Sequence, residues 1–156
     1  MMTDTVRTQV LDAIADKFRT MQAAEPAEDP YGVEWSIVSR DPIKQLTKGK
    51  ARALGVYGTD TQRKGNFPFV TVTLGLVIEV HVAKVENKDM SRTVEEHIGV
   101  VERRLKEDGT LGGLVHDIIV TGDQVTVDGP YDNQAEGALF CMVRYSQQEN
   151  DPRQGR

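Results

Sequence analysis

Three histidines and one cysteine are the residues of this sequence that most readily do chemistry. His81, His97 and His116 stand far apart, and none belongs to a short metal-binding pair such as His-Glu-x-x-His. Cys141 lies in an apolar stretch, where a cysteine usually packs as a small hydrophobic residue. No nucleophile stands beside a base that could activate it. We therefore expect no metal site, no cofactor and no enzymatic activity.

Four carboxylates in the last third of the chain could in principle bind calcium. They are Asp123, Asp128, Asp132 and Glu136. An EF-hand loop needs oxygen ligands at alternating positions and a glycine at the sixth, and this spacing does not match it. We expect a solvated turn here.

The stretch TLGGLV, residues 110–115, raises the question of a phosphate-binding loop. Such a loop follows a strand and opens a helix, so that the helix N-terminus faces the anion. Here the order is reversed, because a helical pattern precedes the glycines and a strand pattern follows them. The interpretation is a structural corner made by Leu111, Gly112, Gly113 and Leu114, where the glycines allow a change of direction and a close approach of the backbone.

Helical periodicity marks residues 5–22 and 92–107. Apolar residues recur there every three or four positions, as expected for one buried stripe on each helix. Ser91 is the expected N-cap of the second helix. The two stripes are Val6, Val10, Ile14, Phe18 and Met21, and Val94, Ile98, Val101 and Leu105.

Alternating apolar residues from Val70 to Val82 predict a long, half-buried strand. Gly75 falls on its other face and indicates a bulge or bend. His81 is also on that other face, so we expect it at the surface. Trp35 lies on an apolar strand face and is expected in the core. Further strands are expected at 33–39, 51–57, 118–127 and 137–145, with 58–66 as a mobile hairpin loop.

This order of elements predicts an α+β fold, a mixed and mostly antiparallel β-sheet packed by two main helices, with a protruding β-hairpin. The 156 residues fit one domain, which we place at 1–146, with 147–156 as a flexible polar tail. The single cysteine excludes an intramolecular disulfide. We see no secretory signal, and the longest uncharged stretch, 65–78, is too short and too polar to span a bilayer.

Charge is unevenly distributed along the chain. The net charge is −5, which argues against a general nucleic-acid binder. Residues 40–64 contain seven bases and two acids, whereas 117–136 contain five acids and no base. Such asymmetry serves partner recognition or marks two solvated faces. The candidate interface residues are Lys44, Lys48, Lys50, Arg52, Arg63, Lys64, Asp123, Asp128, Asp132 and Glu136.

The order of elements, together with the segment TLGGLVHDI (110–118), resembles the tail terminator proteins of long-tailed bacteriophages, which are similar to the lambda-type minor tail protein that ends the tail tube. The family pattern has an N-terminal helix, a β-hairpin, a long strand, a helix ending in a Leu-Gly-Gly segment, and two closing strands. The resemblance covers about residues 4–146. The sequence departs from the family pattern in its basic stretch, 40–64, and in the acidic linker AAEPAEDPYG, 23–32, that follows the first helix.

The resemblance implies a structural virion protein with no catalytic residues, assembled in the host cytoplasm and located in the neck region of the tail. It would form a ring of six copies that caps the tail tube, stops its growth and offers a surface to the neck or head-completion protein, and it could also touch a tail sheath. Genome DNA would pass through the lumen without specific binding. Two alternatives stay open, another head-tail connector or tail-tube protein, and a small cytoplasmic enzyme or ligand-binding domain.

Overall fold

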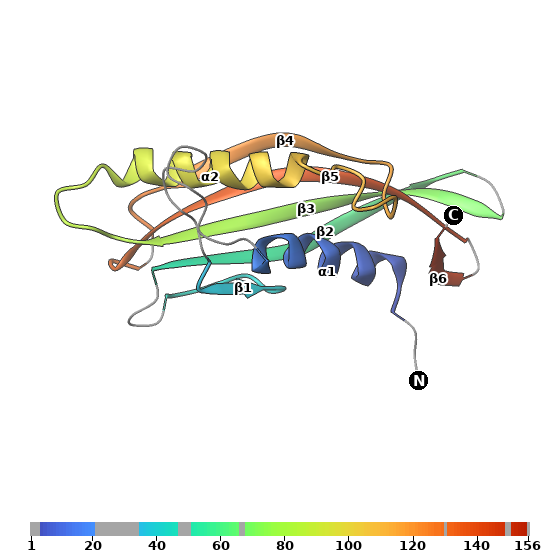
Figure 1. Ribbon diagram of the computed structural model, residues 1–156, viewed down its shortest axis with the longest axis horizontal. Helices are drawn as coiled ribbons and strands as arrows, with labels where there is room; N and C mark the ends of the chain where they lie inside the picture. The colour runs from blue at the N-terminus through green and yellow to red at the C-terminus, as the bar shows by residue number, and fades with distance from the viewer. Residues whose placement is uncertain are drawn as a thin grey trace.

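The computed structural model describes residues 4–20, 35–46, 51–65, 68–129, 131–148 and 151–155. Two helices and a six-stranded, mostly antiparallel sheet make up this part of the chain, so the predicted α+β class is confirmed (Figure 1). The elements are α1 (Val6–Arg19), β1 (Ile37–Ser39), β2 (Arg52–Lys64), β3 (Phe69–Ala83), α2 (Met90–Lys106), β4 (Asp117–Thr126), β5 (Gln134–Gln148) and β6 (Asp151–Gly155).

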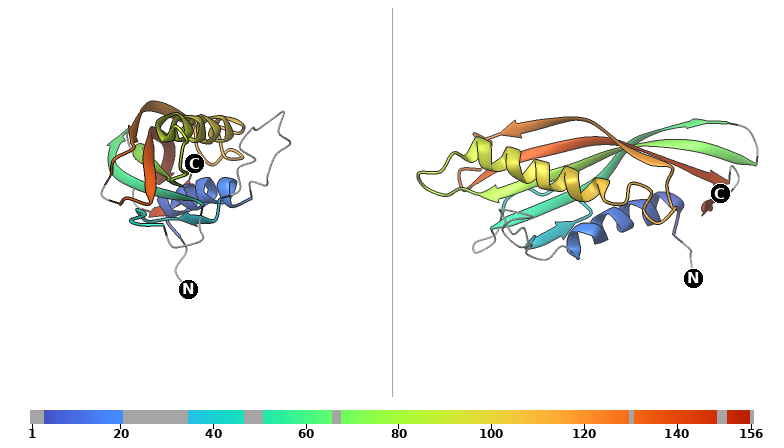
Figure 2. Two further views of the ribbon diagram at one scale, coloured as in Figure 1. Left: turned by 90° about the vertical axis from the view of Figure 1, so that its left-hand side faces the viewer. Right: turned by 45° about the horizontal axis from the view of Figure 1, so that its top comes forward.

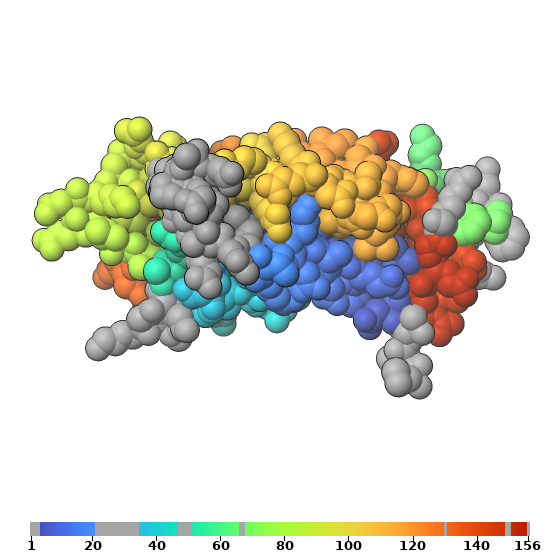
Figure 3. Space-filling model, viewed as in Figure 1, coloured from blue at the N-terminus to red at the C-terminus, as the bar shows by residue number. Residues whose placement is uncertain are grey.

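The strand order in the sheet is β1-β2-β3-β5-β4, and β6 pairs with the end of β5. Only β1 runs parallel to its neighbour, β2, and the other pairs are antiparallel. Both helices lie on one face of the sheet, α2 over β3, β4 and β5 and α1 over β1 and β2 (Figures 1 and 2). Figure 3 shows the two helices side by side across this face. The opposite face is called the open face below.

The core lies between the helices and the sheet. Alternate side chains of β3 and β5 point into it, because successive residues of a strand face opposite sides. The expected helix stripes meet them, and apart from Met21, which is outside the described residues, every member of the two stripes is buried. At Gly137 a Cβ atom would lie 2.6 Å from Val94 Cγ1, so this glycine lets α2 approach β5 closely.

The β2–β3 hairpin differs from the prediction for 58–66. Residues 58–64 are not a loop, because β2 continues through Lys64 and pairs with β3. They are polar because they belong to the outer part of the hairpin, called the arm, which extends beyond the helices and leaves most of their side chains exposed (Figure 2). The irregularity expected at Gly75 lies in the partner strand, between Gly58 and Thr61. Thr59 there leans over Gly75, where a Cβ would collide with its hydroxyl.

The two ends of the sheet also differ from the prediction. The strand expected at 33–39 is reduced to Ile37–Ser39 in the described residues and lies parallel to β2. Residues 147–156 were expected to form a loose tail. Instead β5 continues through Gln148, and Asp151–Gly155 forms β6, which pairs with β5. Asp89, rather than Ser91, caps α2, because its side chain accepts a hydrogen bond from the backbone N–H of Arg92.

Candidate functional site

The Leu-Gly-Gly segment forms a corner between α2 and β4. Leu111, Gly112 and Gly113 have φ values of 51°, 69° and 91°, in the left-handed region that favours glycine. The expected close approach is wrong, because no atom lies within 4 Å of where a Cβ would sit on Gly112 or Gly113. The glycines are needed for backbone conformation. Leu114 is half-buried and, like Leu111, packs against the core.

Asp108 holds this corner together. Its carboxylate accepts hydrogen bonds from the Thr110 hydroxyl (3.0 Å) and from the backbone N–H groups of Gly112 (2.8 Å) and Thr110 (3.3 Å). The Thr110 hydroxyl, followed by the Gly112 N–H, lowers the pKa of Asp108 below its usual value. The Gly112 N–H that a phosphate would need is already donated to this carboxylate, which supports the structural interpretation of the segment.

The basic residues of 40–64 do not form one patch. Lys44 and Arg52 lie at the end of the sheet where β2 begins, whereas Arg63 and Lys64 lie at the far end of β2. Thirteen strand residues place the two groups about 40 Å apart. Lys48 and Lys50 are outside the described residues.

The acidic residues lie mostly at the end where β4 stops and β5 starts. Thr126 of β4 pairs with Glu136 of β5, and the exposed Asp128 and Asp132 lie in the connection between these strands. Asp123 is further along β4, opposite Leu139. This is the end that also holds Lys44 and Arg52. Within one chain, the acidic group is therefore next to part of the basic group and far from Arg63 and Lys64.

Residues 40–46, here called the strap, cross the open face from β1 towards β5. Gly55 makes room for the strap, because a Cβ there would lie 2.9 Å from the carbonyl oxygen of Asp41. The backbone N–H of Ile43 donates to Glu79 (3.1 Å), and that of Leu46 donates to the Oε1 atom of Gln134 (2.6 Å). Side chains of β3 and β5 thus fix the strap to the sheet.

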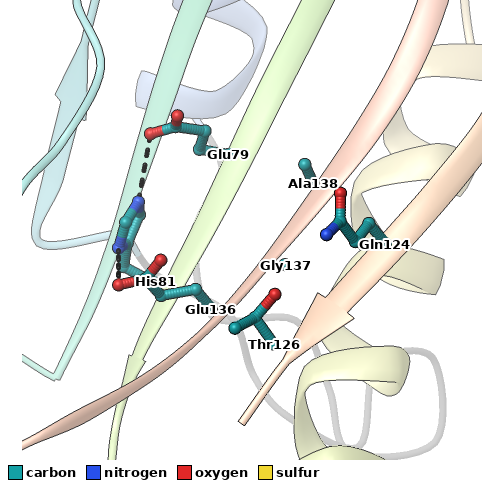
Figure 4. A pocket seen from close by; sticks show the side chains of 7 residues that line it. All are labelled: Glu79, His81, Gln124, Thr126, Glu136, Gly137 and Ala138. Carbon is teal, nitrogen blue, oxygen red and sulfur yellow. Dashed lines mark hydrogen bonds and ion pairs between the residues drawn. The ribbon is translucent and has the colours of Figure 1, made fainter. Parts of the chain in front are cut away.

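The expectation that His81 is exposed is wrong, because the strap covers it. His81 is only 2% exposed. The Nε2 atom of His81 lies 3.1 Å from a Glu79 oxygen, and its Nδ1 atom lies 3.9 Å from a Glu136 oxygen (Figure 4). The Nε2 atom of Gln134 lies 2.9 Å from the same Nδ1 atom. Tyr57 also donates to Glu79 at 2.7 Å, and burial followed by this bond raises the pKa of Tyr57. Sequence pattern cannot find such a network, since its members come from four distant segments.

A hollow of about 140 Å³ lies beside this network on the open face. Its carboxylates, Glu79 and Glu136, have side chains that are 21% and 23% exposed. Figure 4 shows the labelled side chains of β3, β4 and β5 around it. The residues that line the hollow are Glu79, His81, Gln124, Thr126, Glu136, Gly137 and Ala138.

Three further residues singled out in the sequence are buried in the described structure. Trp35 is in the core as predicted, and its ring meets His97 edge-on at 6.0 Å. The Nδ1 atom of His97 lies 2.7 Å from the carbonyl oxygen of Thr93. Burial raises the pKa of the Cys141 thiol to about 12, so this cysteine packs as an apolar residue, as expected.

His116 and Ser146 form a pair that the sequence did not predict. Their Nε2 and Oγ atoms are 2.7 Å apart, although the residues are 30 positions apart in the chain. A base beside a hydroxyl is the arrangement of a nucleophile and its activator. Here Ser146 is only 6% exposed, so a substrate cannot reach its hydroxyl without movement of the sheet. The geometry fits a structural hydrogen bond that ties the corner to β5.

In the described segments, no group of three or more histidine, cysteine or carboxylate side chains is arranged to hold a metal ion. No helix in the described part of the chain is long and apolar enough to cross a bilayer.

Comparison with known proteins finds a likeness among solved structures. No family model matches the chain. No curated protein matches it either. Among solved structures, the chain is similar to the sheath/tube terminator of PVC, an extracellular contractile injection system, in its extended state. The TM-score is 0.43 at 11% identity, and the alignment covers 97% of this chain and 60% of the other. A likeness of this size supports no functional argument.

Proposed function

We propose that this chain is a tail terminator, a structural protein that caps the tail tube of a bacteriophage and stops its polymerisation. It would act as a closed ring, most simply of six copies, and present a surface to the neck or head-completion protein. A sheath, where the tail has one, would be a further partner. The protein would be a virion component assembled in the host cytoplasm, with no catalytic role.

The observation that carries this proposal is the order of the elements around the Leu-Gly-Gly corner. The chain runs from α1 through the short β1 and the long β2–β3 hairpin into α2, then through the corner into β4 and β5, and ends with the short β6. Up to β5, this is the succession that the resemblance to tail terminators implies. Directly after the corner, His116 donates its backbone N–H to the carbonyl oxygen of Arg144 at 2.7 Å, which fixes where β4 starts beside β5.

The charges fit a head-to-tail assembly in which unlike ends meet. Arg63 and Lys64 lie on the arm, too far from Asp128 and Asp132 of the same chain to pair with them. In a ring, the arm of one copy could reach the acidic end of the next copy. Such a contact is heterologous, and repeating it around the ring closes the assembly. Six copies at −5 each would carry about −30, and negative groups facing the lumen would keep passing DNA from adhering.

Deletion of the gene from the phage that encodes it, followed by electron microscopy of the lysate, tests the proposal. Over-long tails without heads are expected, because tube subunits keep adding and no neck surface forms. Tails of normal length with unattached heads would instead indicate a neck connector. Intact virions would overturn the structural role altogether and favour a small enzyme or accessory protein.

A further inference from the structure

The open face of the sheet carries an apolar band that is exposed on β4 and β5, whereas Val77 on β3 is buried and Thr59 lies over Gly75. Strand register places Val77, Phe140 and Gly122 in one row across the sheet, and Gly75, Met142 and Ile119 in the next. Ile119 is 47% exposed and Met142 is 40% exposed. Large hydrophobic side chains this exposed are usually scattered, and two that are paired neighbours on one face of a sheet indicate a contact surface.

Charged side chains flank this band along the strands, two carboxylates on one side and an arginine–aspartate pair on the other. On one side is the hollow with Glu79 and Glu136. On the other side Arg144 projects from β5, with a side chain that is 49% exposed, and it is paired with Asp117. The two flanks are equally far from the middle of the band, since Ala138 on the floor of the hollow and Arg144 are each three residues from Cys141 of β5.

We infer that a second copy of this chain covers the open face, with the two sheets packed face to face about a two-fold axis that runs across the strands at Cys141. Such an axis places Phe140 of each copy over Met142 of the other, and Ala138 over Arg144. The Arg144 guanidinium of one copy then enters the hollow of the other, between Glu79 and Glu136. The same pair forms twice, because a two-fold interface is self-complementary.

Shape supports the same arrangement. Ile119 of one copy lies over Gly122 of the other, and no atom lies within 4 Å of where a Cβ would be on Gly122, so the isoleucine has room. Met142 lies against the Phe140 ring, a favourable sulfur–aromatic contact. The strap of one copy meets Thr71 and Thr73 of the other, side chains small enough to leave space for it.

The size of the surface sets the expected strength. Four strands about 4.8 Å apart and about eight residues of roughly 3.3 Å each give about 500 Å² per copy. A stable interface buries about 800 Å² per partner, so this dimer should be concentration-dependent and dissociate in the micromolar range. It goes beyond the proposed function, because it concerns the free subunit, and tail length in a lysate does not report on it.

Sedimentation velocity of the purified protein, from roughly 1 to 300 micromolar, measures the dimer directly in the range expected for an interface of this size. The wild-type chain should shift from monomer to dimer. Ile119→Asp should abolish the shift, whereas Val85→Asp should not, because Val85 is 54% exposed in the β3–α2 connection, off the sheet. A wild-type chain that stays monomeric throughout, or a dimer that Ile119→Asp leaves unchanged, would overturn the inference.

A mixing experiment tests the contact between Arg144 and the hollow by restoring dimerisation as well as by weakening it. Arg144→Glu and Glu136→Arg should each raise the dissociation constant about tenfold or more, since the symmetric interface repeats each change. Mixed in equal amounts, the two variants should dimerise again, because each brings the charge the other lacks. Circular dichroism confirms that each variant is folded. If folded variants show no gain on mixing, Arg144 does not occupy the hollow of a second copy.

Discussion

Replacing the two corner glycines by alanine should destabilise the protein through backbone conformation alone. Gly112 and Gly113 have φ values of 69° and 91°, and open space surrounds the position of an added methyl group at both. Gly109 stands three residues earlier, also with open space around it, but without a positive φ. Gly109→Ala is therefore a matched control, in which the same methyl group is added and only the backbone conformation differs.

The expected magnitude follows from the cost of the left-handed conformation. An L-residue there costs roughly 1–2 kcal/mol, so Gly112→Ala and Gly113→Ala should each lower the free energy of unfolding by about that amount. In a chain of this size, 1 kcal/mol lowers the melting temperature by about 2–4 °C. Gly109→Ala should instead raise the free energy of unfolding by about 0.4–1 kcal/mol, because alanine restricts the unfolded chain.

Urea unfolding followed by circular dichroism measures these differences, and an unchanged slope against urea shows that the unfolded state is the same. Equal free energies of unfolding for Gly112→Ala, Gly113→Ala and Gly109→Ala would refute the conformational explanation. A property other than the φ angle would then have to explain why the corner contains glycines.

Three further predictions concern the core, the cysteine and the carboxylates. Gly137→Ala should lower the free energy of unfolding by about 1–3 kcal/mol, because its Cβ would meet Val94 Cγ1 at 2.6 Å and Ile98 Cδ1 at 2.7 Å. An unchanged free energy in urea unfolding would show instead that α2 moves away to make room. Cys141, with a pKa of about 12, should carry about one thiolate in ten thousand at pH 8 and react with iodoacetamide only on unfolding, so rapid alkylation of native protein would contradict its burial. The pKa of Asp108 is lowered by the Thr110 hydroxyl and that of Asp117 by the Arg144 guanidinium, so their contribution to stability is complete above about pH 4 and is lost as the pH falls through these lowered values. Asp108→Asn should flatten the acid limb of a thermal-stability profile, and an unchanged limb would show that this carboxylate is not linked to folding.

Periodicity in the sequence was enough to predict the layers of the fold. The apolar alternation from Val70 to Val82 and the helix stripes each report which face a side chain occupies, and packing requires those faces to meet. The protruding hairpin was predicted, but its strands were predicted too short, because residues 58–64 have the glycine, threonine and charge of a loop. A strand that extends past the core has no apolar face to reveal it.

The candidate site was much harder to predict than the layers. Strand alternation correctly placed His81 on the open face, and exposure was predicted from that placement. The prediction of exposure was wrong because the strap that covers His81 comes from a distant segment, 40–46. Basic residues that are close in sequence, such as Arg52 and Lys64, separate when the segment between them is a straight strand. Tertiary placement of this kind leaves no local signal.

Tube length in a reconstituted assembly tests the central proposal most directly. Purified tail-tube subunits would be polymerised with increasing amounts of this protein, and tube lengths would be measured by electron microscopy. The proposal predicts that the mean length falls as the ratio of this protein to tube subunits rises, with a ring visible at one end of each tube. Tubes of the same length and with bare ends at every ratio would contradict it.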